Sequence, residues 1–250
     1  MLDDAEVRVW TARFGVTPEQ VKKDHLISHV LNAIAKTDAA ERVVFFGGTA
    51  LARTHLPDRR MSEDVDLWAE SRSGVLDIIA ESLPRALRRE FPRIRVDNES
   101  ASTRSVTAAD GTRLRLQVVE YGSEYWKCVP LEHRRIDLRY KDLANPVEYR
   151  VPTLASFTAM KHLAWTDRKA PRDLVDLAGL AAMDALNSEA DSVVACLRGF
   201  PVRKYDVDSI PDSTRRAWDF DLANQMRAVP DADQAIQDVR SGWARGLGWE

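Results

Sequence analysis

Two aspartates, Asp64 and Asp66, are separated by one residue and follow a glycine pair, Gly47-Gly48. If the residues around them form a strand, both carboxylates lie on the same side, because side chains alternate along a strand. Like charges this close repel unless a cation lies between them, and a divalent cation with oxygen ligands, such as Mg²⁺, meets that need. The glycines leave room for a phosphate at the free N–H groups of a helix start. A phosphate-binding turn with a carboxylate pair for Mg²⁺ is the minimal equipment for nucleotidyl transfer.

The elements that must position these residues follow from the hydrophobic pattern. Residues 43–46 are β-branched and aromatic, which predicts a buried strand, and residues 49–54 predict a short helix. Each half of the motif is weak alone. A strand followed by two glycines is more often a tight turn, and an Asp-x-Asp pair is more often a solvated face. Their order, with apolar strands behind both, favours nucleotide chemistry.

The pattern resembles the signature of the AbiEii-type nucleotidyltransferase toxins, a family that includes the MenT toxins of mycobacteria. The segments that carry the resemblance are Val21–Leu31, Gly47–Ala52, an arginine at position 59 or 60, Ser62–Leu67, Lys161–Ala164 and Arg168–Leu177. It runs from about residue 17 to residue 180, and the remaining residues carry no motif that matches.

The resemblance implies an NTP-dependent enzyme with Mg²⁺ as cofactor. Asp64 and Asp66 would hold the metal and act in catalysis. The nucleotide-binding residues it implies are Gly47, Gly48, Thr49, Ser62, Asp173 and Arg59, with Arg60 as the alternative to Arg59.

A lysine and an acid from a later segment are implied to complete the site. Pro171 suits the first turn of a helix and places Asp173 and Asp176 one turn apart on a shared side. The resemblance favours Lys161 and Asp176 as catalytic residues, with Asp173 as the second choice. Read without it, Lys161 lies on a surface helix and Asp173 is an acid favoured by the helix dipole.

One position departs from the three-carboxylate pattern of many nucleotidyltransferases. The strand expected to carry the third acid reads Leu114–Glu120, and its central position holds the neutral Gln117. Glu120 lies at the strand end on the opposite face from Gln117. A scheme with three carboxylates and two metals is therefore in doubt.

Composition describes an ordinary soluble globule with a net charge of −3, which argues against indiscriminate nucleic-acid binding. Local basic clusters, which fit either an RNA backbone or solvated faces, are Arg85, Arg88, Arg89, Arg93 and Arg95, and Arg134, Arg135, Arg139 and Lys141. Apolar runs are too short to span a bilayer and the N-terminus is acidic, so we expect a cytoplasmic protein without membrane contact. Cys128 and Cys196 lack metal-ligand spacing, and we expect buried free thiols rather than a disulfide.

Periodicity predicts an α+β fold, a nucleotidyltransferase-like mixed sheet with flanking helices followed by a helical C-terminal region. The expected domains are residues 1–150, the nucleotidyltransferase core with its N-terminal helix, and residues 151–250. The core is expected to hold a helix that begins at Thr17-Pro18, a helix over 74–90, strands between 94 and 121 with a hairpin turn at Asp110-Gly111, and a strand over 134–140. Helices are expected at 153–166, 171–186, 188–199, 213–227 and 231–245.

The resemblance also implies a setting: a growth-inhibiting toxin controlled by a cognate antitoxin. The expected acceptor is RNA, namely the 3′ end of tRNA. The alternatives are a protein acceptor, a small molecule as in the aminoglycoside-modifying enzymes, or a non-catalytic protein with the nucleotide-binding fold. His25 and His29 are the only histidines at helical spacing, and without a glutamate between them in the HExxH arrangement the sequence disfavours a metal site there.

Overall fold

The computed structural model describes residues 2–57, 59–120, 122–143 and 145–249. It consists of two compact units, Met1–Ser123 with Glu132–Val151, and Glu124–Leu131 with Pro152–Glu250. The predicted division into functional domains at residue 150 stays a prediction.

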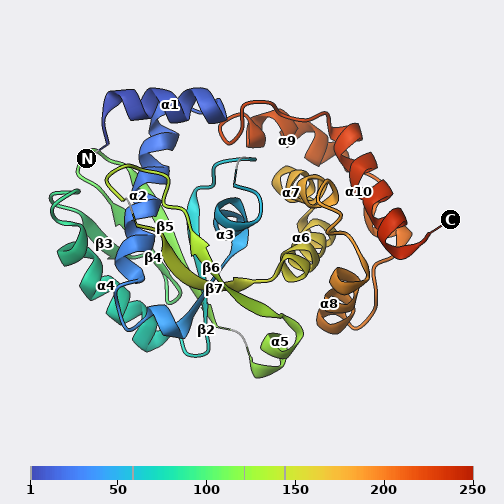
Figure 1. Cartoon of the computed structure of the whole chain (residues 1–250), viewed down its shortest axis with the longest axis horizontal. Coiled ribbons are helices and arrows are strands. Elements are labelled where there is room, and N and C mark those ends of the chain that lie inside the picture. Colours follow the sequence, from blue (N-terminus) through green and yellow to red (C-terminus); the bar gives the residue numbers. More distant parts are fainter. Residues whose placement is uncertain (1, 58, 121, 144, 250) are drawn as a thin grey trace. The chain divides into compact units, whose positions relative to one another are not determined.

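The first unit contains the main sheet and the helices α1 to α4 (Figure 1). Its elements are α1 (Asp4–Phe14), α2 (Pro18–Ile34), the 3-10 turn η1 (Ala40–Arg42), β1 (Val43–Phe46), α3 (Gly47–Thr54), β2 (Asp64–Ala69), α4 (Ser73–Leu87), β3 (Arg95–Asn98), β4 (Thr103–Thr107), β5 (Arg113–Glu120), β6 (Leu131–Ile136) and β7 (Val147–Pro152). The second unit is helical. Its elements are α5 (Ser123–Cys128), α6 (Leu154–Arg168), α7 (Pro171–Ala181), α8 (Ser188–Arg198), the 3-10 turn η2 (Lys204–Val207), α9 (Asp212–Leu222) and α10 (Ala232–Leu247).

The main sheet is mixed, with the strand order β1-β2-β5-β4-β3. Only the central pair β2 and β5 is parallel, while β1–β2, β5–β4 and β4–β3 are antiparallel. Helices α2 and α4 pack against each other, and α2 also contacts β5. Strands β6 and β7 form a separate two-stranded sheet. The predicted α+β fold with a mixed sheet and a helical C-terminal region is confirmed.

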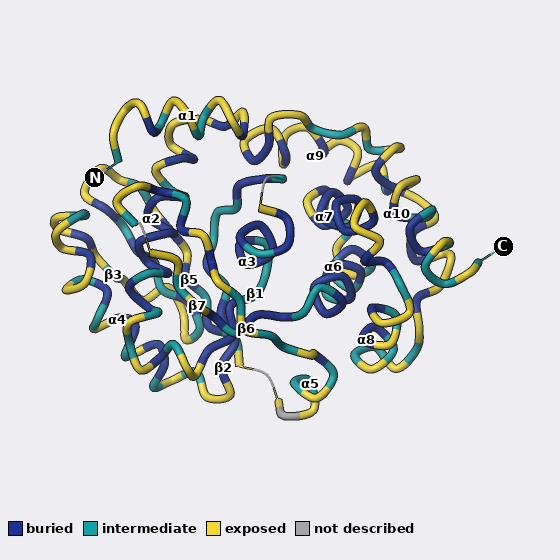
Figure 2. Tube along the Cα trace, in the orientation of Figure 1, coloured by how far each residue is buried: buried dark blue, intermediate teal, exposed yellow. Residues whose placement is uncertain are grey.

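Helix α2 begins where the sequence predicts. The Thr17 hydroxyl accepts a hydrogen bond from the Gln20 N–H at 3.3 Å, and Pro18 occupies the first turn. Its apolar stripe, from Val21 to Ile34, is buried in the core, and these residues are dark blue along the α2 tube in Figure 2. In the parts of the chain that the structure describes, no helix is both long and apolar enough to cross a membrane.

The strand predicted over 134–140 lies earlier in the chain, at Leu131–Ile136. A positive φ of 68° at Arg139 is incompatible with a strand, and the Asp137 carboxylate accepts a hydrogen bond from the Arg139 N–H at 2.8 Å. Helix α7 ends before the predicted residue 186, since Asp184 also has a positive φ. Helix α1 and strand β7 were not predicted, and Tyr121, the expected end of the strand region, lies outside the described residues.

The prediction of free cysteines is wrong. Cys128 and Cys196 form a disulfide, with their Cα atoms 5.5 Å apart. The prediction relied on the default of a reducing cytosol and on sequence spacing, and spacing says nothing about two cysteines 68 residues apart. They meet because residues 124–131 pack with the second unit, so the disulfide joins α5 to α8 within that unit.

Candidate active site

Gly47 joins β1 to α3 in a conformation that requires glycine. Its φ is +79°, in the left-handed region, and a Cβ placed there would lie 2.5 Å from Asp66 Oδ2. The approach follows from the sheet register, which pairs Phe46 on β1 with Asp66 on β2. The backbone of the glycine turn therefore lies directly against one carboxylate of the Asp-x-Asp pair.

Gly48 and Thr49 make the next contacts of the turn. A Cβ at Gly48 would lie 2.6 Å from Arg60 Nη2 and 3.2 Å from Ser62 Oγ, so both polar groups border the first turn of α3. The Thr49 hydroxyl donates a hydrogen bond to the main-chain carbonyl of Asp64. The first turn of α3 is thereby fixed to the start of β2.

The arginine beside the glycine pair is Arg60. Its side chain is buried, and Nη1 donates to the Met61 carbonyl at 3.4 Å. Arg59 is half-buried. The assignment of Arg59 to the nucleotide stays a prediction, and Arg60 is the arginine whose guanidinium borders Gly48.

Strand β5 lies next to the aspartates on the other side of β2. The parallel register pairs Asp64 with Arg115 and Asp66 with Gln117, and Arg115 Nη2 donates to Gln117 Oε1 at 2.8 Å. A neutral amide therefore occupies the place beside Asp66 where a third carboxylate was expected. Glu120 pairs with Ala69 at the far end of β2.

The N-terminus of helix α3 has no side-chain cap. Phe46 occupies the N-cap position and supplies no side-chain hydrogen bond, whereas Thr17 does so for α2 and Thr153 for α6. Helix N-termini with uncapped N–H groups bind phosphate readily. The half-exposed Asp64 and Asp66 lie beside this turn, so phosphate and cation binding fit side by side in one place.

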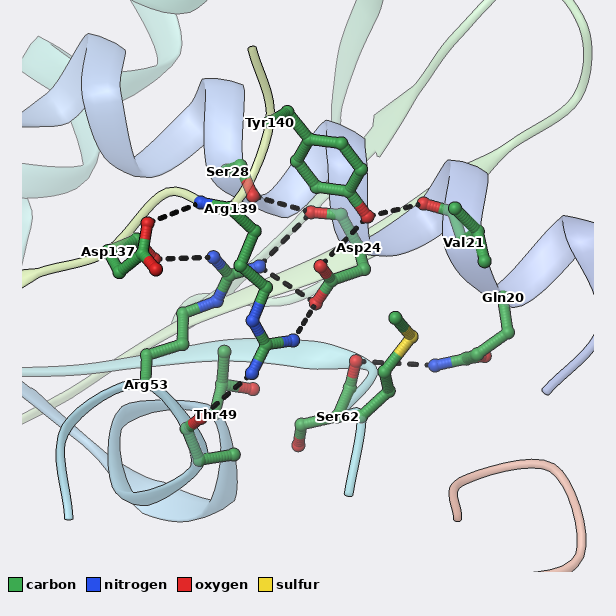
Figure 3. Close-up of polar contacts among 12 residues, drawn as sticks. Gln20, Val21, Asp24, Ser28, Thr49, Arg53, Ser62, Asp137, Arg139 and Tyr140 are labelled. Carbon is green, nitrogen blue, oxygen red and sulfur yellow. Dashed lines mark hydrogen bonds and ion pairs between the residues drawn. The ribbon is translucent and has the colours of Figure 1, made fainter. Parts of the chain in front are cut away.

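A buried ionic network anchors the other end of α3 (Figure 3). Arg53 Nη2 on α3 lies 2.8 Å from Asp24 Oδ1 on α2, and Arg139 Nη1 lies 3.1 Å from the same oxygen. The Tyr140 hydroxyl donates to Asp24 Oδ2 at 2.9 Å. Arg139 Nη2 also donates to the Ala52 carbonyl of α3 at 2.8 Å. One carboxylate thus holds α2, α3 and the segment after β6 together.

The contacts of Asp24 favour the ionised form of its carboxyl group. Burial acts to raise the pKa of Asp24, but the charges of Arg53 and Arg139 outweigh it and the net direction is down. Burial and the Asp24 charge raise the pKa of the Tyr140 hydroxyl, which keeps it protonated as a donor. Sequence reasoning placed no functional weight on Asp24. The available signal was a charge in the apolar stripe of α2, three residues from both Val21 and Ile27.

The second unit brings together the lysine and the two acids of the later motif. Lys161 Nζ on α6 lies 3.1 Å from Asp173 Oδ1 and 2.7 Å from Asp176 Oδ2 on α7. Arg168 forms a bidentate pair with Asp173, in which Nε donates to Oδ2 at 2.7 Å and Nη2 donates to Oδ1 at 2.9 Å. Burial acts to raise the pKa of Asp173, but Lys161 and Arg168 outweigh it and lower the pKa. Pro171 stands in the first turn of α7, as predicted.

The glycine turn yields a matched pair of variants. Gly47→Ala is expected to reduce nucleotidyl transfer, since the added Cβ would displace the Asp66 carboxylate, and to lower the free energy of unfolding by about 1–3 kcal/mol through backbone strain. Gly111→Ala is the control, because Gly111 has a similar φ of +88° but nothing within 4 Å of the added atom.

Transfer rates and urea unfolding of both variants separate the two effects. The two alanines are expected to cost similar stability, and only Gly47→Ala to lose activity. Full activity in Gly47→Ala would show that the close approach to Asp66 has no part in the reaction.

Three solved structures show the same fold. They are the MenT4 nucleotidyltransferase toxin from Mycobacterium tuberculosis H37Rv (TM-score 0.70, 19% identity, covering 100% of this chain and 91% of that one), JHP933 from Helicobacter pylori (0.61, 16%, 94% and 94%), and a putative nucleotidyltransferase from H. pylori (0.61, 16%, 94% and 99%). No curated protein matches the chain.

The sequence profile of one family matches most of the chain. It is described as the nucleotidyl transferase AbiEii toxin of type IV toxin–antitoxin systems, and it matches residues 29–242, which include the glycine turn, the Asp-x-Asp pair and the Lys161 segment. Such a family implies an NTP substrate and an antitoxin partner. The chain belongs to the AbiEii nucleotidyltransferase toxin family and is a nucleotidyltransferase.

Proposed function

We propose that this enzyme transfers a nucleoside monophosphate from an NTP to the 3′ end of tRNA, with release of pyrophosphate. A tRNA extended in this way cannot be aminoacylated, and translation stops. The observation that supports the reaction most strongly is the approach of the Gly47 backbone to the Asp66 carboxylate, because it joins a phosphate-binding turn to a cation-binding pair.

The donor atoms of the first unit fit Mg²⁺. Asp64 and Asp66 lie on one side of β2, are half-exposed, and offer the oxygen ligands that this ion prefers. Bound Mg²⁺ would neutralise charge on the phosphate oxygens during transfer. The N–H groups at the start of α3 would bind the triphosphate, with Ser62 and Arg60 beside them and Thr49 fixing the turn.

Catalytic roles for Lys161 and Asp176 are part of the proposal. The contact of 2.7 Å between them holds the lysine ammonium in place, and Asp173 is itself engaged by Arg168. An ammonium offsets negative charge that develops on transferred phosphate. Replacing Lys161 is therefore expected to lower kcat, and not only to destabilise α6.

An RNA acceptor is supported by exposed basic residues in a chain of net charge −3. Arg85, Arg88 and Arg89 are all exposed at the C-terminal end of α4. A single-stranded RNA end is narrow enough to enter a pocket while its backbone is held by such residues. The setting we propose is the cytoplasm, where NTPs, tRNA and a cognate antitoxin meet.

One labelling experiment tests the acceptor. The purified enzyme is incubated with each α-labelled NTP in turn, together with deacylated tRNA, total cellular protein or a small-molecule extract containing aminoglycosides. Label on tRNA, mapped to its 3′ end by nuclease digestion, is the expected result. Label on protein or on a small molecule alone would refute the tRNA acceptor and keep the nucleotidyltransferase; no transfer to anything would favour a non-catalytic binding protein.

Neutralising the α4 arginines is expected to weaken RNA binding without affecting NTP binding. The triple variant Arg85→Gln, Arg88→Gln and Arg89→Gln should flatten the plot of log affinity against log salt by up to about 0.7 for each phosphate that the protein no longer neutralises. Fluorescence anisotropy with labelled tRNA at several salt concentrations measures this slope. An unchanged slope would mean that RNA is bound elsewhere, and Arg172→Gln, Lys169→Gln and Arg168→Gln in the second unit are the next residues to examine.

A further inference from the structure

Two histidines and two acidic residues lie close together in the first unit. The reaction proposed above uses none of them. His25 and His29 lie one turn apart on α2, Glu90 follows α4, and Asp142 lies between β6 and β7. One ligand atom from each of the four lies within 4.8 Å of all the others. The imidazoles are buried, and Asp142 and Glu90 close the cluster towards the surface.

The spacing of three of these atoms is that of ligands on one zinc ion. His25 Nε2 lies 3.0 Å from Asp142 Oδ2 and 3.1 Å from His29 Nε2, and His29 Nε2 lies 3.3 Å from Asp142 Oδ2. Ligands about 2.0–2.1 Å from a tetrahedral zinc lie about 3.3 Å from one another. An ion bonded to all three would lie about 1 Å out of their plane, with a fourth position left for Glu90 or water.

Hydrogen bonds alone fit this triangle poorly. If both Nε2 atoms carry protons, two donors crowd onto one carboxylate oxygen with their nitrogens 3.1 Å apart. If only one carries a proton, that proton can be shared with the other nitrogen, but the unprotonated nitrogen and the carboxylate oxygen then lie about 3 Å apart with no proton between them. A cation at the centre removes the conflict, because all three atoms then donate lone pairs to it.

Aromatic packing holds the imidazoles in this arrangement. The Phe91 ring lies 5.5 Å from the His25 ring and 5.3 Å from the His29 ring, and Tyr140 meets the His25 ring edge-on at 4.8 Å. The Tyr140 hydroxyl is fixed in turn by Asp24. Such packing keeps both ligand nitrogens in place before an ion arrives, which lowers the cost of binding.

The cluster is open to solvent on one side. A pocket of about 300 Å³ is lined by His25, Glu90 and Phe91, with Lys22 and Asp110 among its other residues. An ion therefore has a route to the cluster, as a metal site requires.

We propose that His25, His29, Asp142 and Glu90 bind one Zn²⁺ ion. Imidazole nitrogens combined with carboxylate oxygens suit zinc, whereas Mg²⁺ prefers oxygen ligands alone. The site would join α2 to the end of α4 and to the segment that carries Arg139 and Tyr140, and so reinforce the network that anchors α3. It rests on no part of the proposed transfer reaction.

Zinc content and zinc-dependent stability test the proposal. The tag-free chain is stripped with a chelator, dialysed against Zn²⁺ and measured by mass spectrometry for metal per chain, and Co²⁺ is added as a spectroscopic probe of four-coordinate binding. We expect one zinc per chain and a higher melting temperature with zinc than with chelator. His29→Gln and Asp142→Asn are each expected to weaken binding by at least about 100-fold.

Two controls make the result specific. His133→Gln changes an exposed histidine outside the cluster and is expected to keep the zinc and the shift in melting temperature. Asp66→Asn is expected to keep the zinc as well, which separates this site from the carboxylate pair of the glycine turn. Three results would each overturn the proposal. They are the absence of stoichiometric zinc in the wild type, zinc binding by His29→Gln and Asp142→Asn that is as tight as in the wild type, and loss of zinc in Asp66→Asn. Because Asp142 lies at the surface end of the cluster, its variant remains informative should His29→Gln fail to fold.

Discussion

Asp66→Asn is expected to lower kcat for nucleotidyl transfer by at least about 10²–10³-fold, which corresponds to about 3–4 kcal/mol of lost transition-state stabilisation. The amide keeps the size of the carboxylate but removes the charge that would hold the cation. The side chain is half-exposed, and its Oδ2 faces the turn at Gly47. Folding should therefore be little affected, with a change in the free energy of unfolding below about 1 kcal/mol.

Label transfer from an α-labelled NTP measures the rate, and urea unfolding checks the fold. Asp64→Asn is expected to behave like Asp66→Asn, because both residues are proposed as metal ligands. Asp97→Asn removes an exposed carboxylate from the edge strand β3 and serves as the matched control with normal activity. Near-wild-type transfer by Asp66→Asn would show that the site has been assigned to the wrong residues.

Short-range features of this chain could be predicted from its sequence because neighbouring residues determine them. The start of α2 is set by Thr17 and Pro18, and the hairpin between β4 and β5 by Asp110-Gly111, where Gly111 has the positive φ that the turn requires. The contact between the glycine turn and the Asp-x-Asp pair could also be predicted, since β1 and β2 are consecutive strands that pair directly.

Contacts between distant segments could not be predicted. Asp142 meets His25 across 117 residues, and nothing near His25 indicates that partner. For this reason the sequence disfavoured a metal site at a place where the structure gathers four candidate ligands. The prediction of free cysteines failed for the same reason, because the proximity of Cys128 and Cys196 depends on how residues 124–131 pack.

The buried network at Asp24 leads to the largest expected effect on stability. Asp24→Asn is expected to lower the free energy of unfolding by about 3–5 kcal/mol, because it leaves the guanidinium groups of Arg53 and Arg139 in the interior without their counter-charge. Such a decrease is a large part of the stability of a typical domain. Because Arg53 lies on α3, nucleotidyl transfer should fall as well.

Urea unfolding at pH 7 measures this decrease with the full contribution of the carboxylate present. The pKa of Asp24 lies below its ordinary value of 3.8 in the folded chain, so its stabilisation persists above that pH and disappears only as the pH falls through the lower folded value.

Two further variants provide smaller decreases in the free energy of unfolding for comparison. Tyr140→Phe removes one hydrogen bond to Asp24 and should cost about 1–2 kcal/mol. Glu124→Gln breaks a pair with Lys127 whose side chains are 83% and 68% exposed, and should cost less than about 1 kcal/mol. A destabilisation at Asp24 no greater than that at Glu124 would show that solvent or a rearranged partner compensates the two arginines, and that the network does not anchor α3.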